Sequence, residues 1–461
     1  MRILLVPLAV GVLAGCARFE PRPIAPADTA SQLDQRRLDA PALKSFLEQN
    51  LHRELAPWPL AAWDLKTLTL AAYYYQPSLD LARAQWAVAR GGEITAGQRP
   101  NPSLNVTPGY DVTTLVPSPW IPLGFLDVPL ETAGKRGYRR AQSQHLSEAA
   151  RLNIATVAWQ IRSDVRSAAL DLAASGQREA LLGEQLRLQI NQVQMTEEQV
   201  RAGALAGSDA LTFRIAQGKT QLDLADSQRQ RAEARARLAE AIGIPAAALE
   251  GIKLVLPPHP DGIAALTSAE ARHLALISRP DILGALAEYA AAQSALQLEI
   301  AKQYPDVHVA PGYQYDQGDS KWSLGLTVEL PVLNHNQGPI AEARARRDEV
   351  AARFNALQAK VLAEIDRAVA VFRTTETNAT TLRSLAREQA KRQASVAAQY
   401  QAGAVEHLDL LNAQLEAATA ALLQLDGQIK LQQAFGTLED AVRRPLTLPP
   451  AIYESSRNDA H

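Results

Sequence analysis

The sequence has very little of several residue types, and each scarcity argues against a class of protein. Among 461 residues there is one cysteine, and only 5% are aromatic. A single thiol cannot build a disulfide framework, and so few aromatic rings disfavour a bulky globular core. The net charge is −2 without a run of lysine and arginine, so nothing indicates nucleic acid as a partner. Beyond the N-terminus there is no stretch of about 20 apolar residues, so we expect no helical membrane anchor in the mature chain.

Motifs for catalysis and metal binding are also missing. The sequence has no Gly-rich phosphate loop, no nucleophile elbow and no His-Glu-x-x-His pair. Its eight histidines are scattered, and only His407, flanked by Glu406 and Asp409, hints at a metal ligand. At the start of a helix this triplet is more typical of a solvated tip than of ligands that converge on one ion. We therefore expect no enzyme, no cofactor and no metal site.

The only cysteine stands at the end of a targeting segment. Arg2 precedes an apolar run from Ile3 to Leu13, which leads into Leu13-Ala14-Gly15-Cys16. This pattern is typical of a secretory signal peptide, here residues 1–15. A cysteine directly after Leu-Ala-Gly resembles a bacterial lipobox, in which the thiol is acylated; an ordinary signal with an incidental cysteine is the alternative. Because Ala17 follows, as in lipoproteins sorted to the outer membrane, we expect Cys16 to carry a lipid anchor in that membrane.

Two copies of one alternating ribbon organise the chain. In Pro102–Val112 and again in Pro305–Tyr315, 203 residues later, apolar and polar side chains alternate, which predicts strands with one apolar face. Return strands are expected near 120–129 and 322–331. The second alternates cleanly, whereas Leu123 and Phe125 in the first fall on the polar face. Trp120 and Trp322, next to the hairpin tips, are candidate membrane-interface aromatics.

Strands of about ten residues with one apolar face fit a membrane β-barrel. A bilayer tolerates only closed sheets, since an open edge leaves backbone N–H and C=O groups unpaired in hydrocarbon. Four strands are too few, because the smallest membrane barrels have about eight. We therefore expect the chain to contribute its strands to a barrel shared within an oligomer.

Long helical patterns follow each strand pair. Residues 134–201 and 340–401 contain no proline, so each predicts a helix on the order of 100 Å long. Apolar residues at steps of three and four predict helix-on-helix packing. The returning helix carries a heptad seam from Leu408 to Ile429. Its counterpart 200 residues earlier is smaller on average, which predicts two seams of unequal tightness; its members are Leu211, Ile215, Gly218, Leu222 and Ala225.

The duplication predicts the domain boundaries. After the signal peptide, residues 16–37 are expected to form a lipid-anchored extended linker, because they are rich in proline and polar groups. The first repeat is expected over 38–248 and the second over 267–444, each a helix–strand–strand–helix unit. Residues 249–266 should link the repeats, and 445–461 should form a loose C-terminal tail.

The turns between the long helices repeat as well. Val200-Arg201-Ala202-Gly203 matches Tyr400-Gln401-Ala402-Gly403, and both glycines suit the left-handed position after a helix. Asp209 and Asp409 fall in the first turn of the returning helices, where a carboxylate suits the positive dipole end. Helix capping and a role in a pore remain equally open for these two aspartates.

The duplicated order, the Tyr400-Gln-Ala-Gly403 turn followed by Leu408-Asp409-Leu-Leu-Asn412, and the lipobox resemble TolC-like outer-membrane efflux factors, from about Leu38 to Arg443. The resemblance implies a mainly α fold with a small β membrane part. It implies a homotrimer whose twelve-stranded β-barrel continues into an α-helical coiled-coil barrel in the periplasm. Its partners would be outer-membrane lipid, an inner-membrane pump and a periplasmic adaptor (membrane fusion) protein that opens the tip.

The resemblance also implies roles for residues at the tip. Tyr400, Asp409 and Asn412 would line the pore constriction, and the Gly203 and Gly403 turns would receive the adaptor. Asn412 stands where the family has a second aspartate, and Val405 stands where an arginine can occur. Charge gating in this chain is therefore expected to be weaker or differently arranged.

Three functions follow as hypotheses. The first is a passive export duct of a tripartite pump, for small molecules or metal cations. The second is the outer-membrane channel of a type I protein secretion system. The third is a lipid-anchored coiled-coil scaffold without a pore, which gives no reason for strands with one apolar and one polar face. The sequence does not name the transported substrate.

Overall fold

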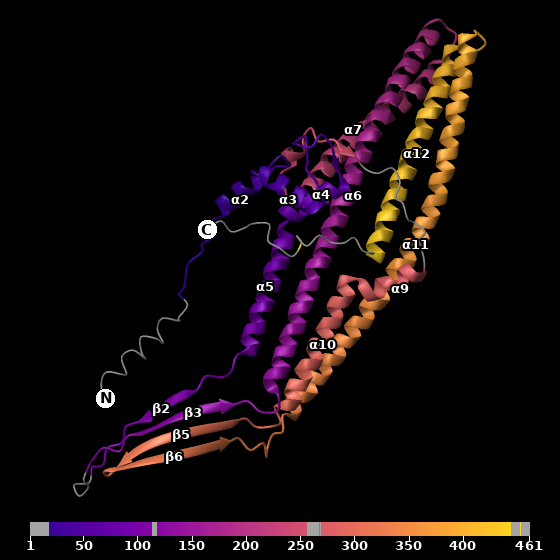
Figure 1. The fold of residues 1–461 in the computed structure, drawn as a ribbon. Helices are drawn as coiled ribbons and strands as arrows, with labels where there is room; N and C mark the ends of the chain where they lie inside the picture. The colour runs from indigo at the N-terminus through magenta and orange to yellow at the C-terminus, as the bar shows by residue number, and fades with distance from the viewer. Residues whose placement is uncertain (1–17, 113–117, 256–266, 268, 444–451, 453–461) are drawn as a thin grey trace.

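The computed structural model describes residues 18–112, 118–255, 267, 269–443 and 452. Two repeats lie side by side, with a four-stranded sheet at one end and the tips of two long helical hairpins at the other (Figure 1). The first repeat consists of α4 (Leu65–Tyr75), α5 (Pro77–Gly97), β2 (Ser103–Thr107), β3 (Leu123–Leu130), α6 (Lys135–Arg201) and α7 (Gly207–Ile242). The second consists of α9 (Ala269–Ser278), α10 (Pro280–Ala301), β5 (Val307–Asp316), β6 (Asp319–Val328), α11 (Gln337–Gln401) and α12 (His407–Val442). This duplicated, mainly helical architecture confirms the predicted fold.

Pro77 and Pro280 occupy matching positions at the starts of helices α5 and α10. Each proline is the first residue of a new helix, where its missing N–H costs no hydrogen bond. In both repeats, the residue directly before this proline contacts the C-terminal end of the last helix of its repeat, α7 or α12. The Gln76 side chain donates to the Ala241 carbonyl oxygen at 3.0 Å, and Arg279 donates to that of Ala441 at 2.6 Å. A side-chain donor suits these orphan carbonyls.

The second of these caps is ionic. The Arg279 guanidinium also pairs with Asp281 at 2.7 Å, and Arg443 lies 3.4 Å from the same carboxylate. Burial works against ionisation of Asp281, but the hydrogen bonds from Arg279 and the charges of Arg443 and Arg279 outweigh it and lower the pKa of Asp281.

Two flanking segments differ from their predictions. Residues 26–34 form helix α2 (Pro26–Asp34) instead of an extended linker, because Pro26 at the first position starts a helix although none of its residues is buried. Helix α3 (Pro41–Leu51), the pair β1 (Trp63–Asp64) and β4 (Leu254–Val255), and the 3-10 turn η1 (Ala246–Leu249) lie beside the first repeat. In the tail expected to be loose, Ile452 is fully buried and its carbonyl accepts a hydrogen bond from Arg83 at 2.9 Å. Cys16 lies outside the described residues.

The four strands form one antiparallel sheet in the order β2-β3-β5-β6. The register aligns apolar residues across it: Leu104 faces Leu126, and Val309 faces Leu326. These side chains and their same-side neighbours form the apolar face, whose members are Leu104, Val106, Leu126, Val128, Leu130, Val307, Val309, Tyr313, Trp322, Leu324, Leu326 and Val328. Leu326 is 68% exposed although apolar, as expected for a side chain turned toward lipid.

The opposite side is the polar face, with Ser103, Asn105, Asp127, His308, Gln314, Ser323 and Thr327. Leu123 and Phe125, the two irregular residues of the sequence pattern, also lie on this side. Phe125 fills space at Gly312, where an added Cβ would come within 3.3 Å of the Phe125 Cβ. The Ser323 Oγ would lie closer still, at 2.8 Å, so Gly312 leaves room for both neighbouring side chains.

The first hairpin is less regular than predicted. Strand β2 has five residues and β3 eight, whereas β5 and β6 have the expected ten. Pro108, Pro119 and Pro122 cannot donate to a ladder, so beyond Thr107 the pairing continues only at single points. Gly109 exchanges two hydrogen bonds with Ile121, at 3.1 and 2.8 Å. Tyr110 and Trp120 form an isolated bridge, and their rings lie edge-on with centroids 5.1 Å apart.

We expect Leu326→Asp to lower the yield of assembled oligomer strongly. A carboxylate on the lipid side near the bilayer midplane costs about 2–4 kcal/mol. The matched control is Ser323→Asp, which places the same group on the polar face. The measurement is the amount of detergent-stable oligomer on native gels of outer membranes. Equal yields of the two variants would contradict the assignment of the faces.

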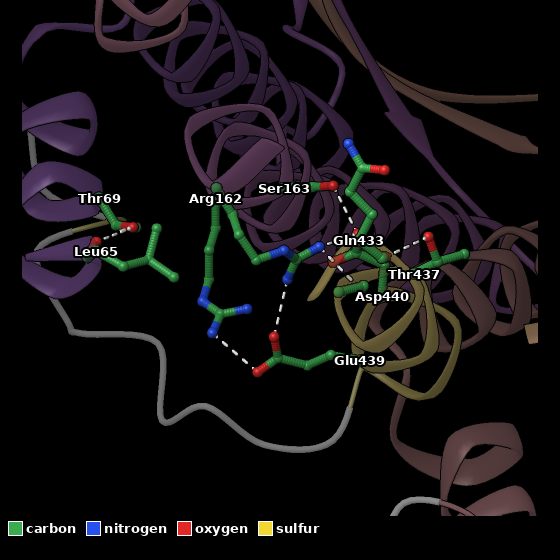
Figure 2. A network of polar contacts seen from close by, with 10 residues as sticks. Leu65, Thr69, Arg162, Ser163, Gln433, Thr437, Glu439 and Asp440 are labelled. Atoms are coloured by element: carbon green, nitrogen blue, oxygen red, sulfur yellow. Dashed lines mark hydrogen bonds and ion pairs between the residues drawn. The ribbon is translucent and has the colours of Figure 1, made fainter. Parts of the chain in front are cut away.

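An ionic cluster joins the two repeats where α12 ends against α6. Figure 2 shows Arg162 and Ser163 of α6 directed at Glu439 and Asp440 of α12. Arg162 donates to Glu439 at 2.9 Å, and Ser163 donates to Asp440 at 2.6 Å. The buried Arg166 binds both carboxylates and the Gly436 carbonyl oxygen. An added Cβ at residue 436 would lie 2.5 Å from the Arg166 Nε, so the guanidinium occupies space that only glycine leaves free.

Candidate pore and tip site

The tips are two turns of the same geometry at the far end from the sheet (Figure 1). Gly203 and Gly403 have φ of 74° and 72°. In each turn the N–H after the glycine, of Ala204 or Ala404, reaches back five residues to a helix carbonyl at 2.9 Å. This arrangement satisfies carbonyls that the helix end leaves free, as the glycine spacing predicted.

Asp409 caps the helix that leaves the second tip. Its Oδ2 accepts a hydrogen bond from the Glu406 backbone N–H at 3.1 Å, and its own side chain is exposed. The capping role is therefore present in the structure, and it leaves the charge open to solvent. Asp209 lies in the first turn of α7, but its side chain is outside the described part of the chain.

Two further tip residues lie near Asp409. The Tyr400 ring stacks on His407, with centroids 5.2 Å apart and planes 28° from parallel. Val405 and Asn412 line, together with Asp409, a groove of about 810 Å³ between α11 and α12. Within the described residues no group of three His, Cys, Asp or Glu side chains is placed to hold a metal ion.

Asn412 also makes a contact that the sequence did not suggest. Its Oδ1 accepts a hydrogen bond from the Gln192 Nε2 of α6 at 2.7 Å, so the tip of the second hairpin is tied to the first by a neutral pair. Gln192 belongs to a buried polar row on α6 with Gln189 and Thr196. The signal in the sequence was the interruption of an apolar stripe by polar residues at steps of three and four.

The apolar stripe of α7 is not covered by any described part of this chain. Leu211 is 55% exposed, whereas its counterpart Leu411 on α12 is 2% exposed. Ile215 and Leu222 are exposed as well, although their counterparts on α12 are not. The predicted first-half seam is therefore wrong as a contact within one chain. A row of large apolar side chains in water points to a neighbouring subunit.

Comparison with known proteins shows which proteins this chain resembles in sequence. A model of the outer membrane efflux protein family matches residues 271–442, which span α9 to α12 except for the first residues of α9. The second repeat of the chain thus resembles this family. The chain is 24% identical over 345 residues to the cobalt-zinc-cadmium resistance protein CzcC of Cupriavidus metallidurans, which covers 73% of this chain and 79% of that protein.

Solved structures of outer-membrane proteins have the same fold. The outer-membrane channel OprN superposes with a TM-score of 0.65 at 18% identity, covering 93% of this chain and 98% of that one. The outer membrane protein VceC of Vibrio cholerae gives 0.66 at 19% identity, covering 82% and 95%. The chain thus has the fold of these outer-membrane proteins. Among the described helices none is apolar over a length that crosses a membrane.

The edge strands β2 and β6 have one free side each within this sheet. A ring of three copies would pair each β6 with the next β2, so that the apolar face would meet lipid and the polar face would line the lumen. Trp120 and Trp322 lie at the same end of the sheet, where Trp322 packs on Tyr313 with centroids 5.0 Å apart. Their place at a membrane interface remains a prediction.

Proposed function

We propose that this channel is the outer-membrane part of a tripartite pump that exports divalent transition-metal cations. The similarity to CzcC over 345 residues carries this choice, because that protein is named for resistance to cobalt, zinc and cadmium. The duct itself is passive, so the driving force comes from an inner-membrane pump and an adaptor binds between them. Small organic molecules and secreted polypeptides are the alternative cargoes.

Growth of a strain that lacks the gene tests the cargo. We expect the strain to lose tolerance to zinc, cobalt or cadmium salts while its tolerance to dyes and detergents stays unchanged. The wild-type gene should restore growth. Lost tolerance to organic compounds alone would contradict the proposal, and so would a polypeptide retained in the periplasm with normal metal tolerance.

For the adaptor we propose docking at the Gly203 and Gly403 turns. Both turns are exposed, both lie at the end of the helices farthest from the membrane, and no side chain lies within 4 Å of a Cβ built on either glycine. A docking protein therefore meets backbone and small side chains on six equivalent turns of the trimer. The similar geometry of the two turns suits an adaptor that contacts both repeats in the same way.

For the gate we propose that Asp409, with Asn412 and Tyr400, lines the resting constriction. Asp409 lies in the first turn of α12, at the narrow end of the hairpin, and its charge is exposed. Three-fold symmetry would bring three carboxylates toward the axis, where such a ring favours cations. Asp209 is expected on the outer wall, where it forms no equivalent ring.

Single-channel recording in planar bilayers tests this gate. We expect Asp409→Asn to reduce block by multivalent cations added from the periplasmic side, because the amide keeps a hydrogen-bond acceptor for Glu406 but removes the charge. Asp409→Ala should reduce block equally and also cost about 1 kcal/mol of helix capping. Asp209→Ala is the control and should leave block nearly intact. Normal block in Asp409→Asn would mean that Asp409 only caps the helix.

We also propose that Cys16 is acylated and forms the mature N-terminus. The lipobox-like Leu-Ala-Gly-Cys sequence supports this. Intact-mass measurement should find a lipid mass on wild-type protein that is absent from Cys16→Ser. The same mass for both proteins would overturn it. The barrel itself holds the protein in the membrane, so the variant should retain export.

A further inference from the structure

The polar face of the sheet carries one histidine with the geometry of a metal ligand. Nδ1 of His308, in β5, lies 3.0 and 3.1 Å from the two carboxylate oxygens of Asp127, in β3. A carboxylate at this distance accepts the Nδ1 proton of a neutral imidazole, which leaves the lone pair on Nε2. Nε2 makes no hydrogen bond within the described chain. Metal-binding histidines are typically held in this way, with the far ring nitrogen hydrogen-bonded to a carboxylate.

The position of His308 makes that lone pair accessible from the lumen. His308 alternates with Val307 and Val309, which lie on the apolar face, so its ring lies on the opposite side of the sheet. Its side chain is 40% exposed. Its direct neighbours across the strands are Pro129 and Thr327, and neither is charged.

A nearby ion pair keeps a lysine away from the histidine and Asp127. Asp306 precedes His308 by two residues, close to the foot of the barrel. One of its carboxylate oxygens, Oδ1, binds Lys135 at 2.8 Å and the Thr132 N–H at 2.9 Å. Lys135 is therefore engaged by Asp306, and no ion pair of a lysine or arginine with Asp127 occurs among the described residues.

We propose that His308 binds the exported cation through Nε2, with Asp127 as the residue that positions the ring. The proposal deepens the proposed export of transition metals and rests on it. Imidazole suits zinc and its neighbours, whereas magnesium and calcium prefer oxygen ligands. Because no group of three His, Cys, Asp or Glu side chains converges among the described residues, His308 is the one ligand proposed here. Water must complete the coordination shell, and binding is weak. Weak binding suits a duct, since an ion must enter the site and also leave it.

Zinc and magnesium block of the open trimer in planar bilayers separates this site from general electrostatics. We expect His308→Gln to require about tenfold more zinc for the same fall in conductance, with magnesium block unchanged. His335→Gln, which changes an exposed histidine of the β6–α11 connection, should behave as wild type. Asp127→Asn should weaken zinc block less than His308→Gln, because the amide oxygen still accepts the Nδ1 proton. Wild-type conductance in the absence of divalent ions establishes that each variant is folded and inserted.

The outcomes distinguish this inference from the proposed function. Unchanged zinc block in His308→Gln would overturn the site even if the gene confers metal tolerance. An equal loss of zinc and magnesium block would also overturn it, since that result would indicate a change in the electrostatic potential of the lumen and no specific zinc ligand. Zinc block that depends on His308 in a channel whose loss leaves metal tolerance intact would support the binding site and overturn the proposed cargo.

Discussion

Replacing Arg166 by alanine is expected to destabilise the folded chain by about 3–5 kcal/mol, because it leaves Asp440 without its ion-pair partner and Glu439 with Arg162 alone. The Arg166 side chain is 9% exposed and donates to Glu439, Asp440 and the Gly436 carbonyl oxygen. Asp440 Oδ1 already lacks a hydrogen-bond partner among the described residues, so the loss of Arg166 removes most of the compensation of that charge. The cluster joins α6 to α12, and its loss therefore affects the contact between the repeats.

The measurement is the midpoint of denaturant unfolding of the purified protein in detergent. Arg353→Ala is the matched control, since Arg353 pairs with Glu349 on the open surface of α11, where such pairs contribute about 1 kcal/mol or less. Arg166→Ala combined with Glu439→Gln and Asp440→Asn should recover part of the loss, because no buried charge is then left alone. Equal midpoints for Arg166→Ala and Arg353→Ala would contradict the importance of the cluster.

The repeating features of this fold were predictable from sequence because they follow local rules. A constant offset near 200 residues revealed the duplication, and proline-free stretches gave the long helices now observed as α6 and α11. The positions of the turn glycines, Gly203 and Gly403, could be predicted from one rule: a helix often ends with a residue in the left-handed conformation. Alternation also indicated which residues of the second strand pair share a face, whereas the facing of the irregular strand 120–129 could not be decided from its pattern.

Features that depend on distant partners were not predictable. The α7 stripe has the same pattern as the α12 stripe, and the pattern does not say whether Leu211 meets its own chain or another. Arg166 and Asp440 are 274 residues apart, and nothing in either neighbourhood marks the pair. The site residues divide in the same way. Local sequence signals predicted the capping position of Asp409. The contact of Asn412 with Gln192 and the pairing of His308 with Asp127 arise only from the packing and register of separate elements.

Gly243→Ala is expected to cost about 3 kcal/mol, more than a positive φ alone explains. Gly243 ends α7 with a φ of 84°, and an added Cβ would lie 2.9 Å from the Tyr75 carbonyl oxygen and 3.3 Å from the Gln76 Cα. Both atoms are backbone at the end of α4, so they cannot rotate away. Arg36 increases the constraint, because its Nη1 donates to the carbonyl oxygens of Tyr75 and Gly243 at 2.6 and 2.8 Å and fixes the two helix ends together.

Gly251→Ala isolates the contribution of backbone conformation. Gly251 has a φ of 74°, and nothing lies within 4 Å of its added Cβ, so this variant should lose only about 1 kcal/mol from left-handed strain. The difference between the two unfolding midpoints then measures the close approach of α7 to α4. If both variants lose the same stability, the two helix ends separate at little cost, and Arg36 does not hold them in the packed arrangement. A larger loss in Gly243→Ala that falls when Arg36→Ala is added would show that the clash acts through that contact.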